Sequence, residues 1–281
     1  MGKSNFPVNS REYKLMLNPS VFKDLEKGLN ETTDMIHRLL EQQGALFTEE
    51  RKDKKRKVWY QDTRTHDIRN NSFLLRIREE KGDEYKITLK NRHSDRYIAA
   101  SYDLSKPVQE ADIILDEFKF EEDIMPKFTS KYSASADFKT NQMPKFATFQ
   151  NVLMLTPLLD NLGIPSTEIL TKVNNFEAKE ISYDMGTVKF DDDKGKAKVQ
   201  LSLWYLSGQS PVIVEFDIDA EAKNSTHEGS KHLEEFPTSL TFGIYKFYLA
   251  LQNEDIVDKT SPKTKTDYAY DFGKTNSHVM S

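Results

Sequence analysis

Residues 212–219 read Val-Ile-Val-Glu-Phe-Asp-Ile-Asp, and from Val214 onward apolar and acidic side chains alternate. Successive side chains of a β-strand point to opposite faces of its sheet, so one face of this strand is apolar. The other face carries three carboxylates in a row, on Glu215, Asp217 and Asp219. A single strand of this kind is also typical of an ordinary sheet with one solvated face.

A second stretch shows the same alternation with the opposite charge. Residues 73–90 predict a hairpin around Gly82, because two β-rich runs flank a Gly-containing turn. Arg76 and Arg78 alternate with apolar residues on the first strand. The predicted register brings together on one face of the hairpin the basic residues Arg76, Arg78, Lys86 and Lys90.

Like charges that face one another across a sheet destabilise it unless something neutralises them. An anion between the arginines and lysines of the hairpin would do so, and a divalent cation at Glu215 and Asp217 would do the same for the carboxylates. The predicted strand at residues 11–17 adds Glu12 and Lys14 on its polar face. Oxygen ligands without cysteine suit Mg²⁺ or Mn²⁺.

These stretches resemble, in order and spacing, the CYTH family of triphosphate tunnel metalloenzymes. The N-terminal family motif Glu-x-Glu-x-Lys corresponds to residues 10–14, with Ser10 in place of its first Glu. The other matching stretches are Tyr60-Gln61-Asp62-Thr63, Leu75-Arg76-Ile77-Arg78, Thr88-Leu89-Lys90 and Glu215-Phe216-Asp217, the last with Asp for the family's second Glu.

The resemblance implies an α+β fold, an eight-stranded antiparallel closed β-barrel with its charged groups inside and helices packed outside. We expect one domain over residues 1–281. A helical or loop insertion is expected around 107–166, and a C-terminal helix and tail over 238–281. The basic run at 50–57 predicts a solvated loop.

The activity that the resemblance implies is metal-dependent hydrolysis of a triphosphate: inorganic tripolyphosphate, thiamine triphosphate, or a nucleoside or RNA triphosphate. The implied catalytic residues are Glu12, Lys14, Arg76 and Arg78. The implied phosphate-binding residues are Lys14, Arg76, Arg78, Lys86, Lys90 and Lys172. The implied ligands of Mg²⁺ or Mn²⁺ are Glu12, Glu215 and Asp217.

Several positions depart from the family pattern. Near the position where the family has a mid-chain arginine, the only basic residue is Lys172. The family also has an aspartate on the strand that precedes its Glu-x-Glu strand, and the matching residues 201–204 contain no carboxylate. A lysine near the C-terminus, Lys263 or Lys265, would contact phosphate. The alternative function is therefore a degenerate barrel that binds polyphosphate or a nucleotide without turnover.

Composition narrows the class of protein further. The 281 residues carry a net charge of −5 and no cysteine, which argues against general nucleic-acid binding and excludes disulfides and thiol catalysis. No apolar run suits a bilayer, and residues 1–10 lack the core of a signal peptide. We expect a cytoplasmic protein whose partner is a triphosphate-containing small molecule or an RNA 5′ end, with no DNA and no membrane. Monomer and homodimer both stay open.

Overall fold

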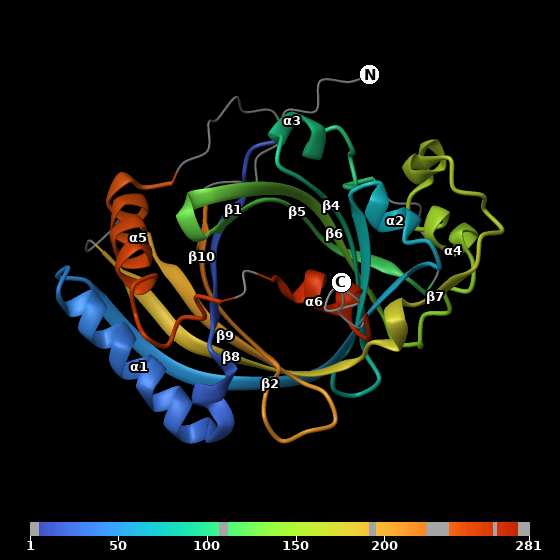
Figure 1. Cartoon of the computed structure of the whole chain (residues 1–281). Coiled ribbons are helices and arrows are strands. Elements are labelled where there is room, and N and C mark those ends of the chain that lie inside the picture. Colours follow the sequence, from blue (N-terminus) through green and yellow to red (C-terminus); the bar gives the residue numbers. More distant parts are fainter. Residues whose placement is uncertain (1–5, 107–111, 191–194, 223–235, 261–262, 275–281) are drawn as a thin grey trace, which may run out of the picture.

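A single sheet closes on itself to form the wall of a tunnel (Figure 1). This computed structural model describes residues 6–106, 112–190, 195–222, 236–260 and 263–274. Within them, backbone hydrogen bonds run round a ring of nine strands. In their order around the ring these are β3 (Phe73–Glu79), β4 (Tyr85–His93), β6 (Thr129–Thr140), β5 (Ile114–Met125), β1 (Ser10–Leu17), β10 (Ile213–Glu221), β9 (Ala197–Tyr205), β8 (Ala178–Lys189) and β2 (Leu46–Thr63), which pairs again with β3.

The closed sheet within an α+β fold is as expected, but the strand count and the orientation differ from the prediction of eight antiparallel strands. A tenth strand, β7 (Leu170–Lys172), pairs with the end of β2. Strand β1 pairs in parallel with β5 and antiparallel with β10, so the sheet is mixed. The parallel pair arises because the chain reaches β5 by way of β4 rather than through a hairpin from β1.

Part of the stretch 107–166 lies in the tunnel wall rather than in an insertion. It supplies β5 and β6, which pair with each other and join β4 to β1. On β5, Phe120 is buried in the outer core while Glu121 lies in the tunnel wall, as the alternation of a strand requires. The predicted loop at 50–57 is likewise wrong, because those residues belong to β2.

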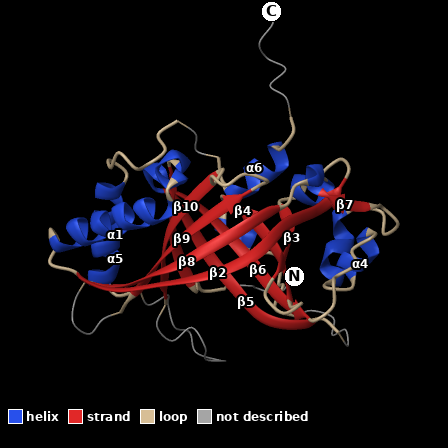
Figure 2. Ribbon diagram, turned by 90° about the horizontal axis from the view of Figure 1, so that it is seen from below, coloured by secondary structure: helices blue, strands red, loops and turns tan. Residues whose placement is uncertain are grey.

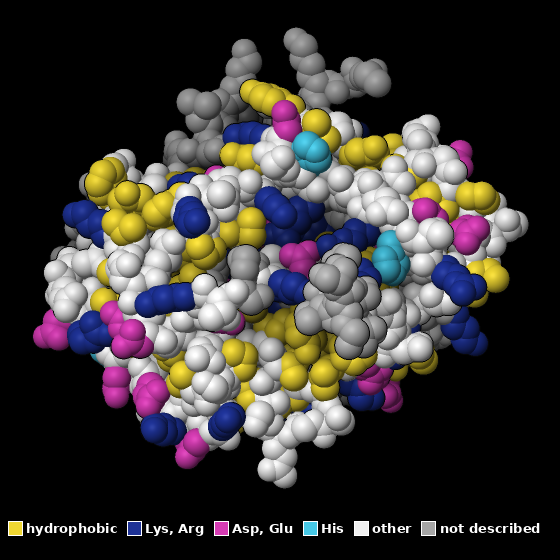
Figure 3. Space-filling model, viewed as in Figure 1, with side chains coloured by type: hydrophobic (Ala, Val, Ile, Leu, Met, Phe, Trp, Pro, Cys, Tyr) yellow, Lys and Arg dark blue, Asp and Glu magenta, His cyan; other side chains and the backbone are white. Residues whose placement is uncertain are grey.

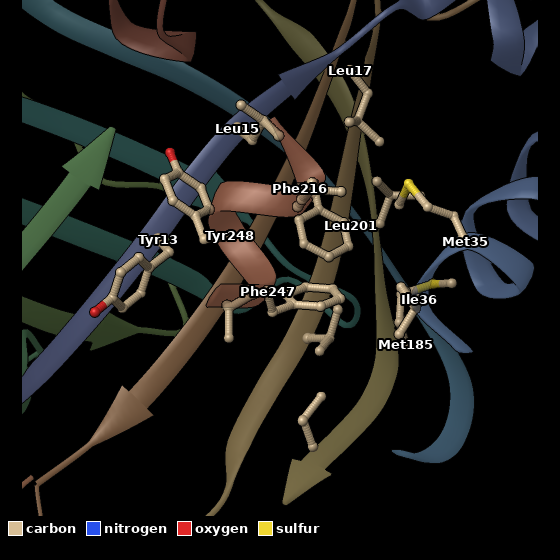
Figure 4. Packing of buried hydrophobic residues seen from close by; sticks show 14 of the residues in the cluster. Tyr13, Leu15, Leu17, Met35, Ile36, Met185, Leu201, Phe216, Phe247 and Tyr248 are labelled. Carbon is tan, nitrogen blue, oxygen red and sulfur yellow. The ribbon is translucent and has the colours of Figure 1, made fainter. Parts of the chain in front are cut away.

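The apolar faces of the strands point outward and are covered by helices. Helix α1 (Leu25–Glu41) begins at Asp24, whose side chain accepts a hydrogen bond from the Lys27 amide. Together with α5 (Thr238–Leu251) it packs on β1, β8, β9 and β10. Figure 4 shows this core; its labelled residues from the strands are Tyr13, Leu15, Leu17, Met185, Leu201 and Phe216, and those from the helices are Met35, Ile36, Phe247 and Tyr248.

A second core covers the opposite side of the ring, outside β3 to β6, under α2 (Asp67–Asn70), α3 (Arg96–Ala99) and α4 (Phe149–Leu153). Both views place the short helix α6 (Lys265–Asp271) at one open end of the closed sheet (Figures 1 and 2). No helix among the described residues is long and apolar enough to cross a membrane.

A glycine permits the close approach of β2 and β8. Gly186 has a φ of +135°, and a Cβ atom there would lie 2.2 Å from the carbonyl oxygen of Thr48. The pairing of β2 with β8 and that of β8 with β9 both change register beside this position, as at a β-bulge.

We predict that Gly186→Ala lowers the free energy of unfolding by about 2–5 kcal/mol, because backbone strain adds to a backbone clash. Urea denaturation measures the effect. The matched control is Gly82→Ala, which has φ +82° but nothing within 4 Å of the added methyl group and should lose only about 1 kcal/mol. Equal losses in both variants would contradict the close approach at Gly186.

Candidate anion-binding tunnel

The interior of the ring is a cavity of about 870 Å³ lined mainly by charged side chains. Strands β1, β3, β4, β5 and β10 and helix α6 all contribute to its lining. Figure 3 shows Lys and Arg side chains gathered in the hollow at the centre of the face seen in Figure 1. The net charge of the whole chain is −5, and carboxylates line the cavity together with these cations.

Arg76 and Arg78 lie side by side in the tunnel with few partners. Strand alternation places Leu75 and Ile77 in the outer core and turns both guanidinium groups inward. Among the described residues, Arg78 makes no side-chain hydrogen bond or ion pair, and Arg76 donates one hydrogen bond, 3.3 Å long, to Thr88 Oγ1. The Nε atoms of both arginines are buried without an acceptor.

The electrostatic surroundings of Arg78 confirm that this wall is short of negative charge. Burial, and then repulsion from Arg76 and Arg56, lowers the pKa of Arg78 to about 9. Cations crowded together in a low-dielectric space each disfavour the charge of the others. An anion bound between them would remove this penalty.

The two lysines predicted on β4 also line the cavity, but each already has a carboxylate partner. Lys86 Nζ lies 2.8 Å from Asp137 Oδ2, and Lys90 Nζ lies 2.7 Å from Glu121 Oε2. Asp137 and Glu121 come from β6 and β5. These lysines are therefore available to a ligand only in exchange for an internal ion pair.

Lys14 belongs to a buried network at the middle of β1. Its Nζ atom lies 2.5 Å from Asp123 Oδ1 and also contacts the carboxylate of Glu12. Arg92 pairs with the other oxygen of Asp123. Although burial alone would raise it, the pKa of Asp123 is held well below its usual range by Arg92, Lys14 and Lys90. Asp123 thus fixes the cations of β1 and β4 in place.

The carboxylates of β10 differ in how far they are neutralised. Glu215 Oε1 lies 3.0 Å from Lys265 Nζ, whereas Asp217 has no ion-pair partner among the described residues. Burial raises the pKa of Asp217 well above its usual range, and the carboxylates of Glu215 and Glu12 raise it further. Burial, then Glu12, raises the pKa of Asp219 to about 7, and one of its oxygens is buried without a partner.

The predicted metal ligands do not form a ready metal site. No group of three or more His, Asp or Glu side chains in the described part of the chain is arranged to hold a metal ion. Glu12 and Glu215 are bonded to Lys14 and Lys265 instead. The residues present therefore do not fit a resident Mg²⁺ or Mn²⁺ at Glu12, Glu215 and Asp217.

Lys172 is not brought to the tunnel. It lies on β7, where its Nζ atom is 2.5 Å from Glu177 Oε2 and 5.1 Å from the ring centre of Trp59. Trp59 belongs to the outer core, so β7 presents Lys172 on the outside of the ring. Of the two C-terminal lysines, Lys265 lines the cavity and Lys263 pairs with Asp271.

Sequence reasoning missed four carboxylates that pair with the cations of the tunnel: the buried Glu121, Asp123 and Glu180, and the half-buried Asp137. Those other than Glu180 lie on β5 and β6, where alternation with Phe118, Phe120 and Phe138 was a usable signal. Glu180 pairs with Arg56 from β2 and accepts a 2.6 Å hydrogen bond from Trp204 Nε1. Nothing in the local sequence around Glu180 indicates these two partners.

Ser10, which stands in place of the family's first Glu, lies within β1 and is 1% exposed. It is in register with Glu121 of β5 and Glu221 of β10. Its hydroxyl group has no hydrogen-bond partner in the described structure. Ser10 thus lies in the strand at the position that the motif predicts, but its side chain supplies a hydroxyl group instead of a carboxylate.

No protein-family model matches this sequence, and no curated protein matches it either. Several solved structures are similar in fold. HpAC1 from Hippeastrum, studied as an adenylyl cyclase and described as having a dominant triphosphatase activity, is 13% identical with a TM-score of 0.46, over 93% of this chain and 95% of its own.

Two further solved structures are similar over most of their length. A protein from Bacillus halodurans, provisionally assigned as an adenylate cyclase, is 14% identical with a TM-score of 0.39, over 92% of this chain and 95% of its own. The PH1819 protein of Pyrococcus horikoshii is 13% identical with a TM-score of 0.37, over 92% of this chain and 96% of its own.

We predict that Asp219 makes stability depend on pH. Its folded-state pKa of about 7 lies above the ordinary value of about 3.9, so the folded protein holds the proton more tightly than the unfolded chain. This contribution is complete below about pH 4 and is lost as the pH rises through 7. Asp219→Asn cannot ionise and should be more stable than the parent at pH 8, by on the order of 2 kcal/mol.

Urea denaturation at pH 4 and pH 8 measures this difference, which should vanish at pH 4. Asp34→Asn, on the exposed face of α1, is the control and should show no such trend. A gain in stability for Asp219→Asn that is the same at both pH values would show that Asp219 does not titrate in this range.

Proposed function

We propose that the tunnel binds a triphosphate-bearing anion. The observation that carries this proposal is the pair of buried arginines on β3: Arg78 has no carboxylate partner among the described residues, and Arg76 has only the Thr88 hydroxyl. Buried cations without partners are costly. A ligand rich in negative oxygens supplies the missing acceptors.

The arrangement of the cations suits a chain of phosphates better than a single carboxylate. Cross-strand register sets Arg78 opposite Lys86 and Arg76 opposite Thr88, with Lys90 one step further along β4. The donors are thus spread along the tunnel instead of converging on one point. Guanidinium groups form paired, charge-assisted hydrogen bonds with phosphate oxygens, so successive phosphates can occupy successive positions.

The lysines of β4 complete this site when the ligand enters. Phosphate oxygens compete with Asp137 and Glu121 for Lys86 and Lys90. The tunnel favours a ligand of high negative charge. Such a ligand must replace Asp137 and Glu121 as the partners of the two lysines, and it must also supply acceptors for the two arginines. Inorganic tripolyphosphate, thiamine triphosphate, nucleoside triphosphates and the triphosphate end of RNA all carry such a chain.

Hydrolysis of the bound phosphoanhydride is the second candidate function, and Asp217 is the observation that favours it. This carboxyl group lines the same cavity as the arginines and has no ion-pair partner in the described structure. Burial raises its pKa, so it binds a proton more tightly than an ordinary aspartate does, and in its ionised form it can accept a proton from an attacking water. The arginines and Lys14 would stabilise the charge that develops on the transferred phosphoryl group.

We predict that Arg78→Met weakens the binding of tripolyphosphate by about tenfold or more, since a charged hydrogen bond contributes about 1.5–3 kcal/mol. Isothermal titration calorimetry measures the dissociation constant. Removing Arg78 leaves no carboxylate unpaired, so the variant should fold at least as stably as the parent. Arg38→Gln, which breaks only an exposed ion pair with Glu254, is the control. Unchanged binding in Arg78→Met would place the anion site elsewhere.

We predict that, if the tunnel turns over its ligand, Asp217→Asn lowers phosphate release at least tenfold while tripolyphosphate still binds, because general acid–base groups contribute about 10²–10⁴-fold. Phosphate release is measured from tripolyphosphate, ATP and thiamine triphosphate, each with and without Mg²⁺ or Mn²⁺. Equal rates in the parent and Asp217→Asn would remove Asp217 from the reaction. Binding without any release by the parent would leave the binding function alone.

A further inference from the structure

Lys265 lies where two carboxylates of different strands converge in the tunnel. Its Nζ atom is 3.0 Å from Glu215 Oε1 and 3.4 Å from Glu180 Oε2. Only 14% of the lysine side chain and 1% of that of Glu180 are exposed. Trp204 flanks the pair, with its ring centre 5.8 Å from Lys265 Nζ. The ammonium group thus lies between two buried carboxylates, of which Glu180 also pairs with Arg56.

Helix α6 holds Lys265 there by contacts outside the cation site. Asp267 accepts a 2.6 Å hydrogen bond from Arg69, and the Tyr270 hydroxyl donates one of 2.8 Å to Asp62. Asn174 donates to the carbonyl oxygens of Ala269 and Tyr270. Anchors at three points along one short helix leave Lys265 little freedom to move.

We propose that the ammonium group of Lys265 takes the place of a divalent cation between Glu180 and Glu215, so that this tunnel binds its phosphate chain without a metal ion. The inference rests on the anion-binding function proposed above. A hard divalent ion is ordinarily held by one or two carboxylates together with the phosphates of the substrate. Two converging carboxylates and a facing phosphate site are present here, and the cation is supplied by the chain.

The charges around Lys265 support this assignment. Although burial alone would raise it, the pKa of Glu215 is lowered by Lys265 and then by Lys14, so Glu215 stays ionised, as beside a metal. An ammonium group differs from a divalent ion in one respect: it carries one charge, not two. Asp217, one step further along β10, is left without a counter-ion among the described residues.

Removing the lysine should therefore open a metal site. We expect Lys265→Met, which keeps the length of the side chain, to gain stabilisation by Mn²⁺ or Mg²⁺ alone. The melting temperature should rise by about 2–4 °C at saturating metal. The parent, measured in the same metal-free and metal-containing buffers, should show no rise. Lys263→Met, which breaks only the ion pair with Asp271, should behave as the parent does.

A double variant keeps the test valid if Lys265→Met folds poorly. Lys265→Met/Glu215→Gln removes the lysine together with its main partner, so no buried charge is orphaned; it should fold and show no response to metal. A metal response in the parent, or none in a folded Lys265→Met protein, would overturn the proposal.

Calorimetry with tripolyphosphate separates this proposal from the one on which it rests. The parent should bind tripolyphosphate with the same affinity in EDTA and in Mg²⁺, whereas Lys265→Met should bind on the order of tenfold more weakly in EDTA and recover with Mg²⁺. Binding by the parent only when metal is present would overturn the role of Lys265 and leave the anion site intact. Absence of binding under every condition would overturn the anion site itself.

Discussion

Because β2 pairs with β8 on one side and with β3 on the other, the ring has no edge, and every second side chain of its strands must share one enclosed space. Charges in such a space are shielded from bulk water and interact strongly over short distances. Each must therefore find an opposite charge, a hydrogen bond or a ligand. The positions of nearly all the functional groups described above follow from this requirement.

The requirement is met unequally around the ring. Cations of β1 and β4 are matched by carboxylates of β5 and β6, and carboxylates of β8 and β10 are matched by a lysine of α6. Among the residues that the structure describes, Arg78 on β3 and Asp217 and Asp219 on β10 have no oppositely charged partner. These unmatched groups mark where a ligand or a proton is still missing, and they are more informative about function than the many satisfied pairs.

The tunnel was predicted from the resemblance of several stretches to the CYTH family, and the shared face of its central cations was predicted from strand alternation, which acts within a few residues. Arg76, Arg78, Lys86 and Lys90 share one face as their spacing requires. The partners of those cations could not be predicted in the same way. Asp123 reaches Lys14 across a parallel pairing of strands that are over a hundred residues apart in the chain, and Lys265 reaches Glu215 from a helix at the far end.

The predictions for residues 50–57 and for Lys172 were wrong for physical reasons. The basic run at 50–57 has the composition of a solvated loop, yet β2 carries it along the wall and turns Arg56 into the cavity, where Glu180 neutralises it. Lys172 was placed in the tunnel by the resemblance alone, as the only basic residue near the family's mid-chain arginine, whereas β7 adds to β2 outside the ring. Local pattern thus indicated which residues face inward on long strands, but not which short strand would stay outside.

The pairing of β1 with β10 has a consequence for the making of the protein. The first strand of the chain must pair with one of the last, Leu17 with Val214 and Ser10 with Glu221. During synthesis β1 leaves the ribosome long before β10 exists, so the ring stays open until that late strand has been made. Contacts so distant in sequence are slow to form, and until they do, β1 and β9 each present an open edge that can pair with another chain. These edges stay exposed between synthesis and closure, so pairing with another chain is the characteristic hazard in the folding of this topology.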